Sequence, residues 1–572
     1  MTGAAPCGEL NCDFLILGSG GAGLMAALHA YDANPKLKIV VVAKGLVGKS
    51  GCTRLVQGGF NAALDPNDSV EKHFLDTVKG GAFLNNQALA WALVLDAPTI
   101  IRKLETKVGV FFDRRADGTI HQKAFAGQSF DRTVHRGDLT GIEIVSRLHD
   151  QLFARQITLI DETRAVELIR SPGGDAVAGA LLLHQRTGDF TLVRARVTLL
   201  ATGGGPRMYK FSAPSIEKVG DGYAMAYRAG CDLLDMEMMQ FHPTGILAGA
   251  SRLSGMVLEE GLRGAGAYLL NAQGERFMAR YDPQRMERST RDLVSRSEYM
   301  EIMAGRGTPA GGVYIDASHL GADFVAKNFP GMVRRCAEVG YDLTRRPVEV
   351  TPTAHFHMGG VAIDDACRTA VAGLLVAGED AGGVHGANRL GGNGVAESCV
   401  FGARAGVTAA QLCAERDVPA ADEAEARSAL ETALQALTRA PDEGENPFAI
   451  RDEVQTTMWE DVGLVRSEPQ LRRAITKLEE LASRAKRCSA PGGRAWNLRW
   501  QQALDVRNLV TVATLTARSA LHRTETRGSH ARSDFPDRDD RRWLVNVHIR
   551  EDRITEIPVE LTRARPDVTV PA

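Results

Sequence analysis

The chain contains 572 residues, with 68 Lys and Arg against 70 Asp and Glu. A single hydrophobic core stops growing at about 250–300 residues, so a chain of this length should divide into two or more domains. The near balance of charge gives no reason to expect nucleic acid or an anionic membrane surface as the partner.

No apolar run reaches the roughly 20 residues that a membrane span needs, and the segment before Cys12 lacks the features of a secretory signal. We therefore expect a cytoplasmic chain that does not itself cross a membrane. Its 9 cysteines are scattered and free of CxxC spacing, which argues against an iron–sulfur cluster, a structural zinc or a disulfide framework. No metal site is predicted, and any iron–sulfur cluster that accepts electrons would belong to another subunit.

The first predicted elements form a dinucleotide-binding unit. Residues 12–17 are an apolar strand, the next six read GSGGAG, and an Ala-rich helix follows over 25–31. Glycines in this loop allow a tight turn, and the N-terminus of the helix favours a pyrophosphate through its free N–H groups and its dipole. The residues expected to bind the cofactor here are Gly18, Gly20, Gly21, Ala22 and Gly23.

The second predicted strand, over residues 38–44, ends at Lys44, where an acidic residue would normally bind the adenosine ribose. This departure argues against a plain NAD site. Two further turns of the same kind, LLATGGG at 199–205 and VAGED at 376–380, follow at wide separation. Because FAD proteins use several such turns, we predict FAD. The expected contacts in these turns are Ala201, Thr202, Gly203 and Glu379.

Three regions with different sequence patterns follow one another along the chain. Short β-branched runs alternate with helical periods up to about residue 235 and return at 373–379, as in a parallel sheet covered by helices. The stretch between them is rich in His, Arg and Gly, with strand-like pieces at 267–271 and 312–315. From residue 421 the sequence is charged and helix-periodic, as in a helical bundle.

We therefore predict an α/β fold: a Rossmann-like FAD-binding domain with an inserted α+β capping domain, followed by a helical domain and a short C-terminal domain. The predicted boundaries are 1–235 and 351–420 for the FAD-binding domain, 236–350 for the capping domain, 421–535 for the helical domain and 536–572 for the tail. Helices are expected from about residue 394 and over 423–440, 468–483 and 496–520, and a strand over 543–549.

The middle of the chain carries four motifs that bring His and Arg together. They are FHPTG at 241–245, EGLRG at 260–264, TRDLVSR at 290–296 and PTAHFHMGG at 352–360. An Arg fork suits bidentate binding of a carboxylate. A lone His is more often a partly buried, hydrogen-bonded residue than a ligand. In this setting, however, His242 and His355 are predicted to face a small organic acid.

With these motifs the chain resembles the flavoprotein subunit of succinate dehydrogenase and fumarate reductase, a family that also includes L-aspartate oxidase. The resemblance extends from Asp13 to about Trp543. Further matching segments are QGGFNA at 57–62, GDG at 220–222, HGANRLG at 385–391, MWEDVG at 458–463 and RTETRGSHARSDFP at 523–536. So many motifs in one order are highly specific for the superfamily.

The resemblance implies an FAD-dependent enzyme that interconverts succinate and fumarate. In the family pattern the residue matching Arg291 exchanges a proton with the substrate, relayed by those matching Glu260 and Arg263, while flavin N5 exchanges the hydride. An Arg is a poor acid or base at its reference pKa, so this role rests on the resemblance alone.

The resemblance also implies how the substrate and the cofactor are held. His355 and Arg389 match residues that hold one substrate carboxylate, and His242 matches a residue that helps to hold the other. Further implied cofactor contacts are Lys44, Ser50, Gly51, Cys52, Thr53, Gln57, Gly58, Gly59, Asp221, Asn393, Gly394 and Val395. The implied partners are a small dicarboxylate, an iron–sulfur subunit, and in addition a membrane quinone-binding subunit. Such partners would place the chain at the inner face of the cell membrane.

Three positions depart from the family pattern. Covalent members carry a flavin-linking His where this chain has Cys52, so we predict non-covalent FAD. The loop after Arg389 reads GGNGV at 391–395 where many relatives have SNSL, which puts details of the pocket in doubt.

The third departure is Glu259, which stands where the family usually has a Thr that helps to bind the second carboxylate. An ionised Glu259 would repel a dicarboxylate by roughly 4 kcal/mol at about 4 Å with an effective dielectric constant near 20. Either Glu259 is protonated or turned away, or the substrate end that it faces is neutral or cationic. The alternatives are therefore an L-aspartate oxidase or a related dehydrogenase or reductase of another small carboxylic acid. A catalytically silent flavin-binding scaffold is disfavoured by the joint presence of Arg291, His242, His355 and Arg389.

Overall fold

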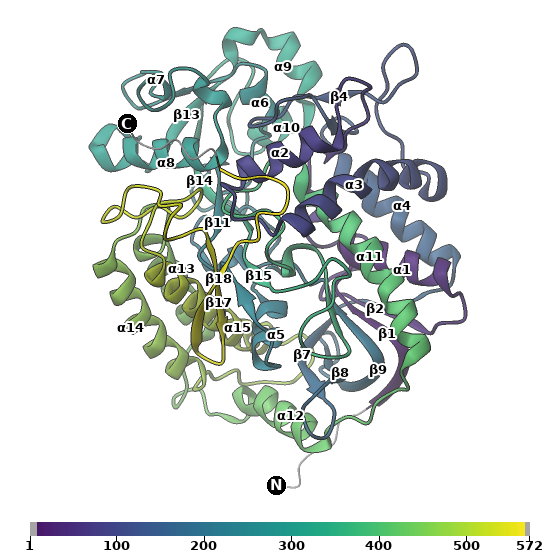
Figure 1. Cartoon of the computed structure of the whole chain (residues 1–572). Helices are drawn as coiled ribbons and strands as arrows, with labels where there is room; N and C mark the ends of the chain where they lie inside the picture. The colour runs from purple at the N-terminus through teal and green to yellow at the C-terminus, as the bar shows by residue number, and fades with distance from the viewer. Residues whose placement is uncertain (1–7, 567–572) are drawn as a thin grey trace.

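The computed structural model describes residues 8–566, and a seven-stranded sheet organises its first half (Figure 1). The strands lie in the order β6-β2-β1-β9-β8-β7, and β16 also pairs with β9. Neighbours from β6 to β9, and β16 with β9, are parallel, whereas β7, β8 and β9 pair antiparallel. The strands are β1 (Gly8–Leu17), β2 (Ile39–Val42), β6 (Thr158–Ile160), β7 (Thr163–Arg170), β8 (Val177–His184), β9 (Phe190–Leu200) and β16 (Leu374–Val376).

Helices cover one face of this sheet (Figure 1). They are α1 (Gly21–Ala33), α3 (Gln87–Lys103), α4 (Thr140–Ala154) and α11 (Asn393–Glu415). Helices α1 and α11 approach closely because Gly402 has no side chain. A Cβ atom at Gly402 would lie 2.5 Å from the carbonyl oxygen of Ala22. The return of the chain at α11 is therefore packed directly against the helix that follows the glycine loop.

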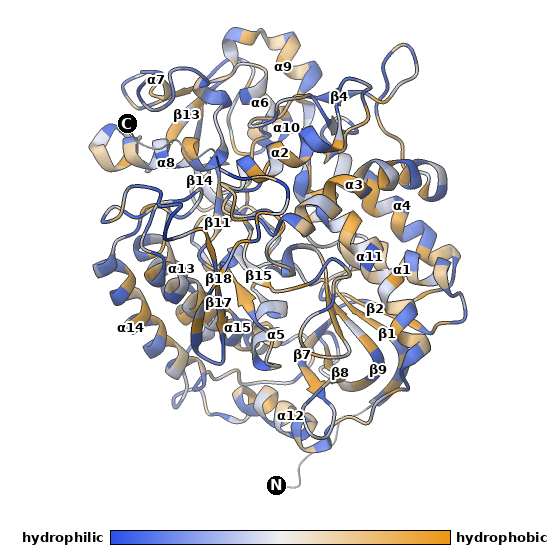
Figure 2. Cartoon of the chain, in the orientation of Figure 1, coloured by the Kyte–Doolittle hydropathy of each residue, from blue (hydrophilic) through white to orange (hydrophobic). Residues whose placement is uncertain are grey.

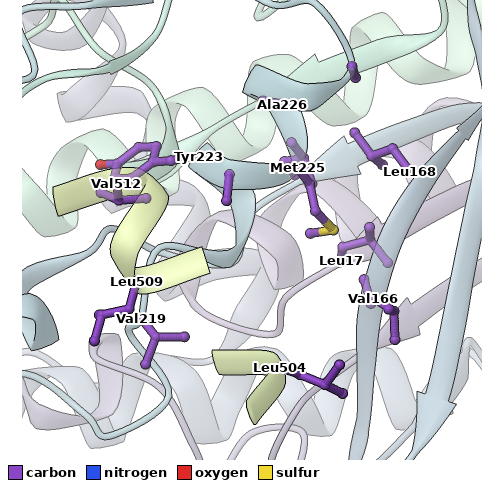
Figure 3. Close-up of a cluster of buried hydrophobic side chains, with 14 of the residues drawn as sticks. Leu17, Val166, Leu168, Val219, Tyr223, Met225, Ala226, Leu504, Leu509 and Val512 are labelled. Atoms are coloured by element: carbon purple, nitrogen blue, oxygen red, sulfur yellow. The ribbon is translucent and has the colours of Figure 1, made fainter. Parts of the chain in front are cut away.

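The opposite face of the sheet packs against α5 (Asp221–Arg228) and α15 (Leu498–His522), and Figure 3 shows part of this cluster. The side chains include Leu17, Val166, Leu168, Val219, Tyr223, Met225, Leu504, Leu509 and Val512. The strands between the two layers are largely hydrophobic (Figure 2), as strands buried on both faces must be.

The inserted region contains a second sheet, with the strand order β11-β14-β13-β12. Its strands are β11 (Met239–Ile246), β12 (Tyr268–Leu270), β13 (Val313–Asp316) and β14 (Val348–His357). The helices packed around it are α6 (Gly261–Gly264), α7 (Met278–Tyr281), α8 (Arg291–Glu301), α9 (Ala322–Asn328) and α10 (Pro330–Ala337). This region has a hydrophobic core of its own, which includes Leu258, Leu262 and Val294. We call it the cap.

A small three-stranded sheet packs against the start of α11, where the Asn61 side chain donates to the Gly391 carbonyl oxygen at 2.7 Å. It consists of β3 (Phe60–Asn61), β4 (Gln122–Lys123) and β5 (Thr133–Val134) in the order β3-β5-β4, and α2 (Val70–Gly80) follows β3 in the chain. This sheet is important below because β4 carries Lys123.

The C-terminal third is helical, as expected from its periodicity. It contains α12 (Glu423–Thr438), α13 (Pro447–Asp461), α14 (Glu468–Ala485) and α15. Helix α13 was not expected. Its start nevertheless has two ordinary signals, since Pro447 occupies the first turn and the Asn446 side chain accepts a hydrogen bond from the Phe448 N–H.

The predicted α/β class is confirmed, whereas the predicted domain boundaries stay predictions.

Strand pairing shows how the last part of the chain is attached. In the tail, β17 (Val545–Arg550) pairs with β18 (Arg553–Pro558) and with β10 (Leu233–Leu234), which pairs in turn with β15 (Gly360–Val361). Because β10 and β15 flank the cap in sequence, the tail completes the sheet at the base of the cap. Within residues 8–566, no helix combines the length and the apolarity that a membrane crossing requires.

A buried ion cluster fixes the same junction. The Arg523 guanidinium pairs with Glu237 at 2.6 Å, Asp235 at 3.2 Å and Glu525 at 3.1 Å. All four side chains are almost fully buried. Burial and the charge of Glu237 raise the pKa of Asp235 to about 6, against the effect of Arg523. Arg527 also pairs with Glu525, at 2.6 Å, so Asp235 and Glu237 are the two carboxylates that depend on Arg523 alone.

We expect Arg523→Met to destabilise the protein by about 3–5 kcal/mol, because it leaves the buried carboxylates of Asp235 and Glu237 without their counter-ion, although Glu525 keeps Arg527. The midpoint of thermal unfolding should fall clearly. The matched control is Arg553→Met, at an exposed arginine of β18. Equal midpoints for the two variants would contradict the role assigned to the cluster.

Candidate active site

One cavity of about 250 Å³ runs from the glycine loop to the cap. Its lining includes the residues that directly follow β1, β2, β9 and β16, which are Gly18, Ala43, Ala201 and Ala377. The cavity therefore lies at the carboxyl edge of the sheet. Every residue expected to bind the cofactor lines it except Gly23 and Asn393. The lining also includes His242, Glu259, Glu260, Arg291, His355 and Arg389, whereas Arg263 lies behind Glu260.

The glycine loop fits a dinucleotide. Gly18 has a φ of +117°, and a Cβ atom there would lie 2.0 Å from the Ala201 carbonyl oxygen. At Gly23 a Cβ atom would lie 2.0 Å from the Gly18 carbonyl oxygen, so this glycine serves the close packing of helix on strand. Gly20 provides no side-chain cap for helix α1, and the Gly21 N–H donates to Thr53 Oγ1 at 2.9 Å, so the next N–H groups of the first turn are the ones that suit a phosphate.

Asn393 lies outside the cavity because its amide holds the surrounding loops. Its oxygen accepts from Asn61 Nδ2 at 2.7 Å and lies 3.0 Å from His73 Nε2, and its nitrogen donates to Thr77 Oγ1 at 3.0 Å. The side-chain amide is thus engaged within the protein and positions the loop, whereas a contact between Asn393 and the cofactor stays a prediction.

The charged atoms of Lys44 and Asp221 bind each other beside the cavity. Lys44 Nζ lies 3.0 Å from Asp221 and 2.6 Å from Asp505, and Arg164 bridges the same two carboxylates. Burial alone would raise the pKa of Asp221, but Lys44 and Arg164 lower it to about 2. Both residues line the cavity, so their contact with the cofactor stays a prediction, and their charges are paired in one ion cluster.

A second buried pair, which the sequence analysis missed, joins Lys218 to Glu379 in the wall of the cavity. The other oxygen of Glu379 accepts from the His357 N–H at 3.1 Å. Next to it, Asp380 accepts from the Thr202 hydroxyl at 2.9 Å and from the Gly203 N–H at 3.2 Å, and burial raises its pKa to about 7. The turns expected to bind FAD are thus held together by charged groups.

Under the cap, Glu260 joins two guanidinium groups. Arg291 Nε donates to Glu260 Oε2 at 2.9 Å, and Arg263 Nη2 donates to Oε1 at 3.3 Å. Arg291 is the first residue of α8, and Arg263 is further held by the Glu287 carbonyl oxygen at 2.6 Å. Burial raises the pKa of Glu260, but Arg291 and Arg263 lower it below its usual value. Glu260 is therefore ionised between two cations.

Gln240 connects Arg291 to Arg389 and was also missed. Its side-chain oxygen accepts from Arg291 Nη1 at 3.2 Å and from Arg389 Nη2 at 3.1 Å. The guanidinium of Arg389 also lies over the Phe356 ring, 4.6 Å from its centroid. Burial and the charge of Arg291 lower the pKa of Arg389 to about 9, so it stays charged at neutral pH.

His242 and His355 come from adjacent strands, and their ring centroids are 5.2 Å apart. His242 Nδ1 accepts from the Thr244 N–H at 3.3 Å, which leaves Nε2 for another group. Burial, followed by the charge of Arg291, holds the pKa of both rings well below the usual value. Both are neutral near pH 7 and can each donate one N–H.

Glu259 is neither free nor turned away from the cavity. Its Oε1 lies 2.7 Å from Lys123 Nζ, and Lys123 was not among the expected site residues. The alternatives considered for Glu259 did not include an ion pair within the protein, which is what the structure shows. At the other end, Cys52 lines the cavity, its sulfur accepts from the Ser215 N–H at 3.3 Å, and burial raises the pKa of its thiol.

The sheet, the glycine loop and the cationic cavity define an FAD-dependent oxidoreductase. A family model for the FAD binding domain matches residues 13–395, and one for the fumarate reductase flavoprotein C-term matches residues 451–570. The chain belongs to the succinate dehydrogenase and fumarate reductase flavoprotein family, and its cofactor is FAD.

The similarity to named relatives extends over nearly the whole chain. A fumarate reductase (CoM/CoB) subunit of Methanothermobacter marburgensis is 43% identical, covering 92% of this chain and 95% of the relative. The succinate dehydrogenase flavoprotein subunit of Coxiella burnetii is 34% identical and covers 96% of each. Among solved structures, a FrdA mutant of E. coli quinol fumarate reductase superposes with a TM-score of 0.92 at 33% identity, covering 98% of both chains.

We expect Lys218→Met to weaken FAD binding by roughly 10- to 100-fold, because it leaves the buried carboxylate of Glu379 without its partner. Fluorescence titration of the FAD-free protein with FAD measures this directly. Lys218→Met/Glu379→Gln should recover most of the loss, and Lys210→Met, at an exposed lysine nearby, should cause none. An unchanged affinity in Lys218→Met would contradict the assignment.

Proposed function

We propose that this chain interconverts succinate and fumarate, with Arg291 as the residue that exchanges a proton with the substrate. The charge of the cavity carries the proposal. Arg291, Arg263 and Arg389 contribute three positive charges and Glu260 removes one, which leaves two for the two carboxylates of the substrate. His242 and His355, as neutral rings, add hydrogen-bond donors without changing this balance.

The proton route follows the hydrogen bonds around Glu260. When Arg291 gives a proton to a substrate carbon, the ionised Glu260 is placed to take a proton from Arg263 and to pass a proton on to Arg291. Its Oε1 accepts from Arg263 Nη2, and its Oε2 accepts from Arg291 Nε. Bound FAD supplies hydride acceptance and donation at N5. The buried position of these side chains excludes water from the transfer, as a closed cap requires.

His355 and Arg389 are assigned to one carboxylate, and His242 to the other. The Arg389 Nε atom and the His355 Nδ1 atom are buried without a hydrogen-bond partner among the described residues, which suits groups that wait for a ligand. Gln240 aligns Arg389 with Arg291, so the anchor and the proton donor share one support.

An L-aspartate oxidase is the second candidate, since the Glu259 carboxylate could face an ammonium group. Lys123 already occupies one of its oxygens, which favours the dicarboxylate. The test measures the reaction of the purified protein with succinate, with fumarate and with L-aspartate. Bleaching of the flavin by succinate and reoxidation by fumarate are expected. Peroxide formation with L-aspartate alone would overturn the proposal.

For electron transfer, the partner that we propose is an iron–sulfur subunit, joined to a membrane quinone-binding subunit that places this chain at the inner face of the cell membrane. One solved relative is Mycobacterium smegmatis Sdh1 in complex with UQ1, at 36% identity and a TM-score of 0.87. Purification of the native complex followed by iron analysis tests the assignment, and a preparation free of iron that retains dye-linked turnover would count against it.

We expect Arg291→Gln to lower kcat by about 10²- to 10⁴-fold, the range typical of a lost proton-transfer group. The reaction of fumarate with a reduced dye measures the loss. Arg296→Gln is the matched control, because Arg296 lies on the same helix but does not line the cavity. Full turnover in Arg291→Gln would remove Arg291 from the mechanism.

We also expect FAD to be released when the protein is precipitated with acid, because Cys52 replaces the flavin-linking His of covalent relatives. Absorbance of the supernatant and of the washed pellet measures the distribution. Cys52→Ser should behave in the same way. Flavin that stays with the pellet in the native protein and leaves it in Cys52→Ser would show a covalent link.

A further inference from the structure

We propose that Lys123 determines the substrate specificity of this cavity: its ammonium neutralises Glu259 on the cap side and so allows that side to accept the second carboxylate of a dicarboxylate. The inference rests on the function proposed above and deepens it. It assigns the choice between a dicarboxylate and an amino acid to one ion pair.

The geometry of the pair is well defined. Lys123 Nζ lies 2.7 Å from Glu259 Oε1 and donates to the Gly137 carbonyl oxygen at 3.2 Å. An ammonium has three donors, so one remains for a third acceptor. Glu259 is only 3% exposed and lines the cavity, and its Oε2 takes no hydrogen bond from the described residues. The carboxylate therefore borders the space that the substrate would fill.

Without Lys123 this part of the cavity would repel anions. Burial raises the pKa of Glu259, Lys123 opposes that shift, and the carboxylates of Asp138 and Glu260 raise the pKa further. Arg335 also lines the cavity, but it donates to the Val257 carbonyl oxygen at 2.6 Å rather than to Glu259. Lys123 is thus the cation that is bonded to Glu259.

The pair preserves the charge balance on which dicarboxylate binding depends. The two surplus positive charges around Glu260 match a dianion, and an unpaired Glu259 would remove one of them. The cavity would then suit a substrate with one net negative charge, such as an amino dicarboxylate whose ammonium could pair with Glu259. Lys123 therefore shifts the preference of the site from the amino acid to the dicarboxylate.

The pair also spans two parts of the molecule. Lys123 belongs to β4, whereas Glu259 immediately precedes Glu260 in the cap. Beside it, the Gly331 N–H at the start of α10 donates to Asp138 Oδ2 at 2.8 Å, which is a second bond between the same two parts. The specificity element is therefore complete only when the cap is closed.

The test is a binding titration of the holoenzyme with malonate, a dicarboxylate with one carbon between its carboxyl groups, which cannot form an alkene. Flavin absorbance reports binding at pH 6 and pH 8. The variants are Lys123→Met, Glu259→Gln and Lys123→Met/Glu259→Gln, with Lys36→Met, at an exposed lysine, as the matched control. The inhibition constant of L-aspartate is measured for each.

At pH 8, Lys123→Met should weaken malonate binding by roughly 10- to 100-fold, as expected when one partner of a buried charge pair is removed. Part of the loss should return at pH 6, because protonation removes the charge of the unpaired Glu259. The double variant should bind malonate within about threefold of the native protein, since no unpaired carboxylate remains. In Lys123→Met only, the ratio of the affinity for L-aspartate to the affinity for malonate should rise by at least about tenfold.

Unchanged malonate affinity in Lys123→Met, or a double variant as weak as Lys123→Met, would overturn the inference. If Lys123→Met does not accumulate, Glu259→Gln decides the matter, because it should bind malonate at least as tightly as the native protein at pH 8. Failure of the proposed function is seen separately, as native protein that binds malonate with this charge pattern but does not oxidise succinate.

Discussion

Burial of guanidinium charges around a single carboxylate is the constraint on which the site depends. Arg263 and Arg291 are almost fully buried, and removing two such charges from water is tolerated only when a counter-ion and hydrogen bonds replace the solvent. Glu260 supplies that counter-ion to both. Because it can neutralise only one of them, the site keeps a positive excess that a bound anion would complete. The charge state needed for binding is therefore built into the folded chain.

Strands and helix starts place several of these groups, whereas Glu260 and Arg389 lie in the short segments before α6 and α11. Strands β11 and β14 are neighbours, so His242 and His355 face the same space although 113 positions separate them. Arg291 is fixed by the start of α8, and Gln240 ties it to Arg389, which precedes α11. Reactive side chains from the cap thus meet the carboxyl edge of the main sheet, where the cofactor turns lie. Rigid elements hold the geometry that the proposed proton transfer requires.

Local patterns predicted much of this molecule, and long-range pairing accounts for what they missed. The glycine loop and the His and Arg motifs each lie within a short stretch of sequence. They can therefore be recognised without knowing which distant residues they contact, and they could be expected to line one cavity. Lys123 meets a partner 136 positions away, and Lys218 one 161 positions away, so no neighbouring residue indicates their role. The pairing of Lys44 was missed for the same reason, since Asp505 is 461 positions away. Charge pairs between distant segments leave no periodic signal in a single sequence.

The strand β17 has a consequence for how the protein is made. It pairs with β10, near the point where the chain enters the cap, yet it follows β10 by more than 300 residues in the sequence. Segments that emerge earlier can fold during synthesis, but the sheet at the base of the cap stays incomplete until β17 has been made. A nascent chain that stops before β17 therefore lacks one strand of this sheet.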